Sequence, residues 1–362
     1  MNQRSTMLQE QTLSDHRLRR RDFLYQTLLA GAGALGVCRL DAAEDKMPLL
    51  GQGAFQYRPV AGWGVLDAKT PVKNCSAMVV DAKDRIFLLT DHLDNNIIIY
   101  NKEGQLLGKW GKRFPGAHGL QIVKEGNREV LFITDLNLNR VFKTTLDGEI
   151  LMELTYPKST GKYASAKEFR PAWTLHLPDG DFFVLDGYGK DYIMRYNREG
   201  KLLHYFGGPE GGIAHWGPHG GTIDSRGPGE PEMVIAMSDQ QTIKRLSLDG
   251  KLIKEIHLPG SNPRMIQIVG EHMFVPHLAD NWPKDRQSTG YISVLDRDYK
   301  IVSNIGGTVP SYVNGKLEPM QQQGGLFRHP HDLVVASDGA IYVPQFASGN
   351  TYPVKLVPET SA

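Results

Sequence analysis

The stretch that decides the fold reads RHPHDLVV at residues 328–335 and continues as DGAIYVP at residues 338–344. It predicts a histidine at the mouth of an apolar strand, a tight Asp-Gly turn and a second strand. The pattern occurs twice more, as AHGLQIV at 117–123 before VLFITD at 130–135, and as PHGGTID at 218–224 before MVIA at 233–236. His118, His219 and His331 therefore hold one position in three copies of a repeat.

The repeat extends over residues 55–358. Each unit predicts four short strands, with an Asp-Gly or Glu-Gly turn between the last two. Six units open at the following residues: Ser76, His118, Ala172, His219, Arg264 and His331. Six units of four strands predict an all-β, six-bladed β-propeller. The last unit is short of an outer strand, and FQYRPVAGWG at 55–64 resembles that strand in other units. We therefore expect the N-terminal strand to close the last blade.

Two stretches interrupt the repeat, at residues 278–290 and 306–327. We expect both to form loops over one face of the disc. The composition agrees with short strands and turns, because Gly (39) and Pro (21) are plentiful while hydrophobic residues make up 40%. The 41 basic and 40 acidic side chains nearly cancel, which removes any electrostatic argument for nucleic acid or an anionic membrane as a partner.

Residues 1–43 are predicted to be a twin-arginine signal peptide, with residues 44–54 as a linker. A basic segment reads RLRRRDFL at 17–24, and an uncharged run of small and apolar residues follows it to Cys38. A transmembrane anchor is the alternative, but the run is shorter than the roughly 18 to 20 residues that a span needs. The prediction is a periplasmic or extracellular protein with no membrane span after cleavage. Only Cys75 then remains, so no intrachain disulfide is expected.

The propeller geometry brings the six opening residues together. The first strand of each blade lines the central channel, so side chains at its start converge on the axis. Three neutral imidazoles that meet there form a suitable site for zinc or another divalent transition metal, with one position open to water or substrate. A single histidine would more often be packed or exposed; three at one repeat position favour metal ligands. Arg264, which opens the fifth unit, is expected at the equivalent position around the same axis.

These motifs resemble those of peptidyl-α-hydroxyglycine α-amidating lyase, a six-bladed propeller of the NHL-repeat type. The residues that carry the resemblance are HGL at 118–120, DGYGKDYI at 186–193, PHG at 218–220 and PHD at 330–332. By that resemblance, His118, His219 and His331 are zinc ligands and Tyr188 is the catalytic base. Asp332, with the backbone oxygens of Leu120 and Met78, resembles a structural calcium site.

The resemblance implies a lyase or hydrolase that acts on a small-molecule or peptide-derived substrate. A metal ion lowers the pKa of a hydroxyl group, and a nearby dication favours the ionised form of tyrosine, so Tyr188 can act as a base. A separate monooxygenase would have to supply the substrate of an amidating lyase. Two arginines of the lyase are replaced, however, by Gln240 and, near the end of a first-blade strand, by Thr90. Arg264 is the candidate cation for a substrate carboxylate.

Two other functions remain open. The first is a non-catalytic NHL propeller that binds a protein or glycan. In such a protein, removal of the metal would alter only the stability. A sugar lactonase propeller binds its metal mainly through carboxylates and amides, and the three-histidine ring argues against it.

Overall fold

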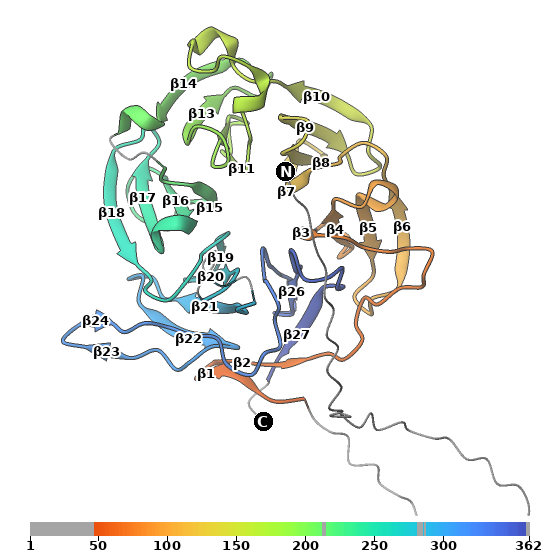
Figure 1. Ribbon diagram of the computed structural model, residues 1–362, viewed down its shortest axis with the longest axis vertical. Helices are drawn as coiled ribbons and strands as arrows, with labels where there is room; N and C mark the ends of the chain where they lie inside the picture. Colours follow the sequence, from red (N-terminus) through yellow and green to blue (C-terminus); the bar gives the residue numbers. More distant parts are fainter. Residues whose placement is uncertain (1–46, 212–214, 281–284, 286, 360–362) are drawn as a thin grey trace, which may run out of the picture. The chain divides into compact units, whose positions relative to one another are not determined.

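The computed structural model describes residues 47–211, 215–280, 285 and 287–359. They form an all-β propeller in which the sheets are arranged around a central axis (Figure 1). This confirms the predicted six-bladed fold. The predicted signal peptide lies outside the described residues. No helix in the described part of the chain is long and apolar enough to cross a membrane.

The first three blades follow the order of the chain from the axis outward. Blade 1 holds β3 (Cys75–Val80), β4 (Ile86–Thr90), β5 (Ile97–Tyr100) and β6 (Leu106–Trp110). Blade 2 holds β7 (Ala117–Glu125), β8 (Arg128–Asp135), β9 (Arg140–Thr145) and β10 (Ile150–Leu154). Blade 3 holds β11 (Trp173–His176), β12 (Phe182–Leu185), β13 (Tyr192–Tyr196) and β14 (Leu202–Gly207).

Blades 4 and 5 repeat this order. Blade 4 holds β15 (Pro218–Asp224), β16 (Glu232–Met237), β17 (Thr242–Ser247) and β18 (Leu252–His257). Blade 5 holds β19 (Gln267–Val269), β20 (His272–His277), β21 (Tyr291–Leu295) and β22 (Ile301–Ile305). Short 3₁₀ helices occur at Leu93–Asn95, Lys158–Thr160, Ala166–Glu168, Pro209–Gly211 and Ser238–Gln240. The buried apolar side chains of the inner and middle strands form the core between neighbouring blades.

Blade 6 combines both ends of the described chain. Its inner strands are β25 (Val334–Val335), β26 (Ile341–Val343) and β27 (Val354–Pro358), and β2 (Phe55–Pro59) pairs with β27. The N-terminal strand therefore closes the ring, as the sequence predicted. A further strand, β1 (Leu50–Gln52), pairs with β2 within the range that we expected to be a linker. Three residues are too few to show an alternating pattern, which is why the sequence did not reveal this strand.

An aromatic contact beyond β2 strengthens this closure. Trp110 of blade 1 packs against Gly148 of blade 2, where a Cβ would lie 2.9 Å from the indole, and its Nε1 donates to a backbone carbonyl at 3.0 Å. Trp63, which follows β2, packs in the same way against Gly104 of blade 1 and donates to the carbonyl of Lys102 at 2.9 Å. The N-terminal segment thus makes a contact that an outer blade strand makes elsewhere in the ring.

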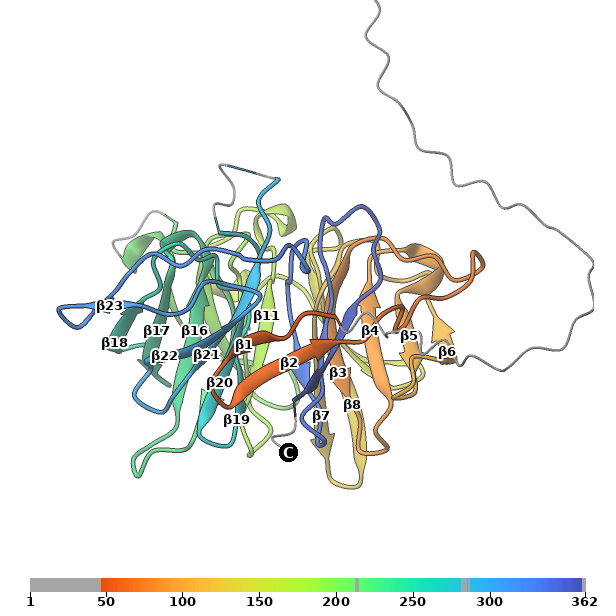
Figure 2. The same cartoon turned by 90° about the horizontal axis from the view of Figure 1, so that it is seen from below.

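The second irregular stretch does not simply cover a face. Within residues 306–327, β23 (Tyr312–Val313) and β24 (Lys316–Leu317) form a hairpin that extends from the rim of the ring (Figures 1 and 2). The amide of Ile301 donates to the hydroxyl of Tyr312 at 2.7 Å, which holds this hairpin beside β22. The expectation of a loop over one face is therefore wrong for this hairpin.

Candidate metal centre

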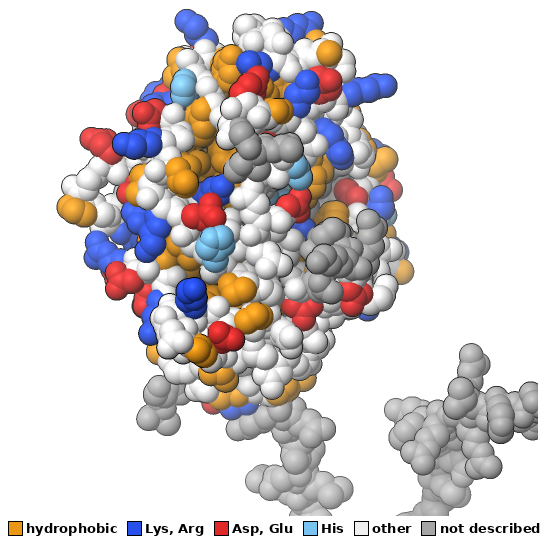
Figure 3. Space-filling view, turned by 60° about the vertical axis from the view of Figure 1, so that its left-hand side comes forward, with side chains coloured by type: hydrophobic (Ala, Val, Ile, Leu, Met, Phe, Trp, Pro, Cys, Tyr) orange, Lys and Arg blue, Asp and Glu red, His pale blue; other side chains and the backbone are white. Residues whose placement is uncertain are grey.

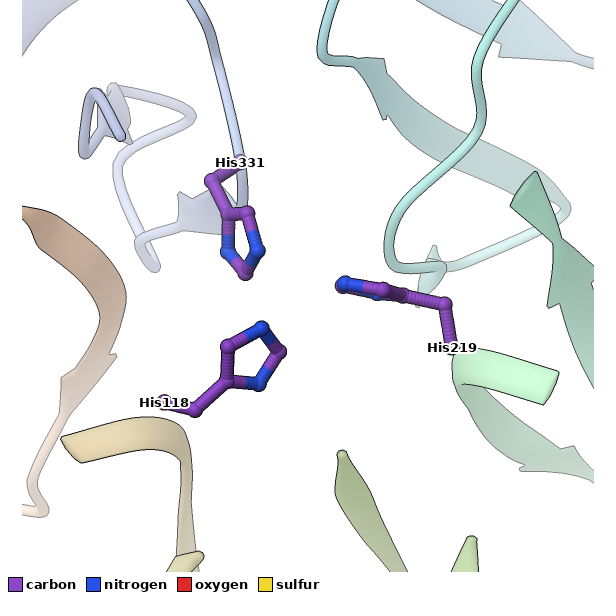
Figure 4. A group of neighbouring side chains, drawn as sticks. All are labelled: His118, His219 and His331. Carbon is purple, nitrogen blue, oxygen red and sulfur yellow. The ribbon is translucent and has the colours of Figure 1, made fainter. Parts of the chain in front are cut away.

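His118, His219 and His331 point toward one another from three different blades (Figure 4). Their ring centroids are 4.7 to 5.0 Å apart, and one nitrogen of each lies within 4.8 Å of the others. His118 and His219 are the second residues of β7 and β15, where the strand register shifts between the residues on either side. Such a bulge redirects a side chain, and here it turns each imidazole toward the axis. His331 lies in the segment before β25.

A backbone carbonyl of the following blade holds each imidazole. Nδ1 of His118 lies 3.0 Å from the oxygen of Ala172, Nδ1 of His219 lies 2.8 Å from that of Arg264, and Nδ1 of His331 lies 2.7 Å from that of Ser76. A carbonyl oxygen can only accept, so each Nδ1 carries the hydrogen. The lone pair of each neutral ring is therefore on Nε2. This is the arrangement by which proteins orient a metal-binding histidine.

The glycines after His118 and His219 make these contacts possible. A Cβ at Gly119 would lie 2.6 Å from the oxygen of Ala172, and one at Gly220 would lie 2.4 Å from the oxygen of Arg264. The His-Gly pairs in the sequence are therefore required by the approach of the next blade.

The triad has the donor set of a divalent metal site. All three side chains are buried, and burial lowers the pKa of His118 to about 4 and those of His219 and His331 well below the usual value. The rings are therefore neutral at physiological pH, as metal ligands must be. Nε2 of His331 is buried and has no hydrogen-bond partner among the residues that the structure describes. Three neutral nitrogen ligands that face one point could hold a metal ion and leave one position open.

Tyr188 lies against the same nitrogens. Its hydroxyl oxygen is 2.9 Å from Nε2 of His219 and 3.2 Å from Nε2 of His118. Burial raises the pKa of this phenol, while the positive charges of Arg264 and Arg170 act in the opposite direction. The hydroxyl of Tyr188 therefore lies beside two of the three candidate ligand nitrogens.

The turn that carries Tyr188 is organised by Asp186, at the end of β12. The Asp186 carboxylate accepts hydrogen bonds from the amide of Arg170 (2.6 Å), the amide of Lys190 (2.8 Å) and the hydroxyl of Tyr163 (2.7 Å). The amide of Tyr188 donates to the carbonyl of Arg170 at 3.3 Å. One buried carboxylate thus fixes both Tyr188 and the backbone of Arg170.

Arg264 reaches the centre from blade 5. Its side chain is buried, and Nη1 lies 3.5 Å from the hydroxyl of Tyr188. Within the described part of the chain, its Nε has no hydrogen-bond partner. Burial lowers the pKa of this guanidinium, and its charge helps to lower the pKa of each of the three histidines. The structure thus brings the five residues of the predicted metal and catalytic sets together.

The Asp332 carboxylate, which the resemblance assigns to a structural cation site, makes hydrogen bonds to the backbone in this structure. One oxygen of the buried Asp332 carboxylate accepts from the amide of Met78 at 3.1 Å, and the other accepts from the amide of Leu333 at 2.7 Å. The carbonyl of Leu120 accepts from the side-chain amide of Gln121 at 3.1 Å. The observed contact of Asp332 with Met78 therefore uses the N–H and not the carbonyl. Burial raises the pKa of Asp332 well above its usual value.

Two residues near the triad were missed by sequence reasoning. The ring of Phe346 lies 5.0 Å from that of His331 and 6.4 Å from that of His118. The guanidinium carbon of Arg170 lies 5.9 Å from the ring centroid of Tyr188. Neither residue occupies a repeated position, so the repeat offered no signal for them.

Gln240 stands where the sequence comparison with the lyase placed the replacement of an arginine. It donates its side-chain amide to the carbonyl of Trp216 at 3.3 Å.

The solved structures that resemble this chain share its propeller fold. A streptogramin B lyase superposes with a TM-score of 0.56 and 14% identity, over 85% of this chain and 100% of that one. Virginiamycin B lyase from Staphylococcus aureus gives a TM-score of 0.52 and 13% identity, over 86% and 99%. At such identities the likeness establishes the fold. No protein family model matches the chain.

The sequence itself is similar to two curated lyases of Drosophila melanogaster. Peptidyl-alpha-hydroxyglycine alpha-amidating lyase 1 is 26% identical over 265 residues, which are 67% of this chain and 45% of that protein. Lyase 2 is 26% identical over 214 residues, which are 49% of this chain and 52% of that protein. The chain spans about half the length of the curated relatives it matches. The resemblance inferred from the motifs is thus confirmed: the chain is a propeller that is similar in sequence to these two lyases.

Proposed function

We propose that this protein is a metal-dependent lyase that cleaves a carbon–nitrogen bond next to a hydroxyl group. The observation that carries the proposal is the convergence of three neutral Nε2 atoms with the hydroxyl of Tyr188, 2.9 and 3.2 Å from two of them. The similarity to amidating lyases supports the same chemistry.

His118, His219 and His331 would hold the ion through Nε2. When bound, a divalent ion such as zinc supplies the Lewis acidity that lowers the pKa of a hydroxyl group. Tyr188 is the base: its phenolate oxygen takes the proton of the substrate hydroxyl, and the positive charge of Arg264 favours that phenolate. The electrons of the O–H bond form a carbonyl, and the C–N bond breaks. Its electron pair stays on nitrogen, which takes the proton back from Tyr188.

The assay follows from this balance of atoms. Purified protein loaded with zinc should convert an N-acyl-α-hydroxyglycine into an amide and an aldehyde acid in equal amounts, and the metal-stripped protein should not. A protein that binds one equivalent of metal but releases neither product from this substrate would contradict the proposed reaction. Chelation that alters only the melting temperature would favour the non-catalytic binding propeller.

We also propose that the chain is exported by the twin-arginine route and that a separate hydroxylating enzyme supplies its substrate. The supporting feature of export is the RLRRRDFL segment at 17–24 with the uncharged run after it. A variant with Arg20→Lys and Arg21→Lys should remain in the cytoplasm on fractionation. Export of this variant at the rate of the unchanged chain would contradict the route.

A further inference from the structure

Positive charge exceeds negative charge around the triad. The guanidinium of Arg264 is buried, its Nε is unpaired, and no ion pair to it occurs within the described residues. Among described carboxylates, Asp239 acts on both Arg264 and Tyr188, but it pairs with Nε2 of His215 at 2.8 Å. A bound divalent ion would add two further charges. Buried charges are stable only when they are paired, so the site lacks an anion.

Arg170 adds a second cation at the rim. Its side chain is exposed and makes no hydrogen bond or ion pair within the described part of the chain, although its guanidinium lies over the ring of Tyr188. Its charge reaches the triad, because it contributes to the lowered pKa of His118. Its backbone is held by Asp186 and by the amide of Tyr188. The backbone of Arg170 is therefore held beside Tyr188, and the N–H groups of its guanidinium have no partner among the described residues.

We propose that Arg264 and Arg170 together bind a carboxylate of the substrate beside Tyr188. This inference rests on the proposed function and deepens it. Arginine presents several N–H donors in a planar fork that matches a carboxylate. Arg264 would meet the anion from blade 5 and Arg170 from the segment before blade 3. Neither arginine stands at the position of Gln240 or Thr90, which replace the two arginines of the amidating lyase. We therefore expect the substrate carboxylate to lie toward Arg264 and Arg170.

Phe346 defines where the rest of the substrate lies. Its ring packs against His331 and His118, whereas Tyr188 packs against His118 and His219. The two aromatic rings therefore flank different edges of the triad. A substrate with its carboxylate at the Tyr188 edge places an apolar group against Phe346. The chemical class that fits is a hydroxy acid or its amide derivative with an aromatic or bulky apolar substituent.

The test measures binding, so it does not depend on turnover. Calorimetric titrations use mandelate, which has a hydroxyl, a carboxylate and a phenyl ring, together with the neutral mandelamide and the ring-free glycolate. Each is measured with zinc-loaded and metal-stripped protein. Arg170→Gln is the main variant, because the side chain is exposed and makes no hydrogen bond or ion pair within the described residues, so we expect the variant to fold. Arg170→Lys keeps the charge without the fork, and Arg128→Gln, an exposed arginine on β8, is the matched control.

Mandelate should bind both forms of the protein, and mandelamide should bind at least tenfold more weakly. Arg170→Gln should weaken mandelate about tenfold in both forms, Arg170→Lys should restore part of that loss, and Arg128→Gln should have no effect. Phe346→Ala should weaken mandelate but not glycolate. Mandelate binding that is insensitive to Arg170 and equal to that of mandelamide would overturn the inference, even if zinc binds. A protein that takes up no zinc but shows the arginine dependence would instead contradict only the proposed function.

Discussion

Nδ1 of His331 lies 2.7 Å from the backbone oxygen of Ser76, and this contact joins the last blade of the ring to the first. His118 and His219 make the same contact with the blades that follow them. The orientation of each imidazole is therefore set by a neighbouring blade and not by its own strand alone. Several properties of the protein should depend on this arrangement.

Replacing one triad histidine should abolish tight metal binding. His219→Ala should weaken zinc binding by at least the 10-fold to 100-fold that losing an outer-shell partner costs, because a direct ligand is lost. Elemental analysis after dialysis measures this. The control is His257→Ala, since that side chain is exposed and pairs with Glu255 at the surface. One full equivalent of metal in His219→Ala would remove His219 from the site.

Removal of the Tyr188 hydroxyl should affect turnover and not metal content. Tyr188→Phe keeps the ring that packs on His118 and His219, but it removes the oxygen 2.9 Å from Nε2 of His219. We expect kcat to fall by roughly 10²-fold to 10⁴-fold, the usual contribution of a general base. Steady-state kinetics and elemental analysis of the same preparation check both statements. An unchanged kcat would exclude Tyr188 as the base.

The metal-free protein should lose stability on acidification. Burial lowers the pKa of His118 from 6.5 to about 4, and those of His219 and His331 also fall well below 6.5. As the pH falls below 6.5, the unfolded chain gains protons that the folded chain does not, so the free energy of unfolding decreases. Urea unfolding in the presence of a chelator measures this slope. His118→Gln should reduce it by up to about 1.4 kcal/mol per pH unit, and an unchanged slope would contradict neutral burial of His118.

The contact of Trp63 with blade 1 should stabilise the closed ring. Trp63 is buried, lies against the rings of Tyr100 and Tyr342, and donates to the carbonyl of Lys102. Trp63→Ala should lower the free energy of unfolding by about 3 to 5 kcal/mol, as is usual for such truncations. Denaturant unfolding beside Trp110→Ala, the equivalent position in blade 1, provides the comparison. A loss under about 0.5 kcal/mol, the size of an ordinary surface substitution, would show that this contact does not hold the ring closed.

A cation at Asp332 remains a prediction that calcium can test. The pKa of this buried carboxylate is raised, so its ionised form at neutral pH lacks a compensating charge. Calcium should therefore raise the melting temperature of the unchanged protein in proportion to the logarithm of its concentration. Asp332→Asn should not respond to calcium. An equal response of both proteins would place any calcium elsewhere.

The sequence predicted the fold and most of the centre because both follow a repeat. His118, His219 and His331 share one position in their units, and the axis of a propeller brings such positions together. The contacts that orient them could not be predicted, since Ser76 and His331 are 255 residues apart and a carbonyl leaves no trace in residue type. Arg170 and Phe346 could not be predicted for another reason. They lie in irregular segments, where a position in the repeat does not indicate where the side chain points.

The three contacts between Nδ1 and a backbone carbonyl also link the triad to the closure of the ring. They connect blade 2 to blade 3, blade 4 to blade 5, and blade 6 to blade 1, so every blade takes part in shaping the triad. The last of these connections joins blade 1 to blade 6, the blade that β2 completes by pairing with β27. In a ring that is open between blades 6 and 1, His118 and His219 keep their carbonyl partners, but His331 lacks its contact with Ser76. A metal ion would then bind tightly only to the closed ring, and its binding would slow the separation of blade 6 from blade 1.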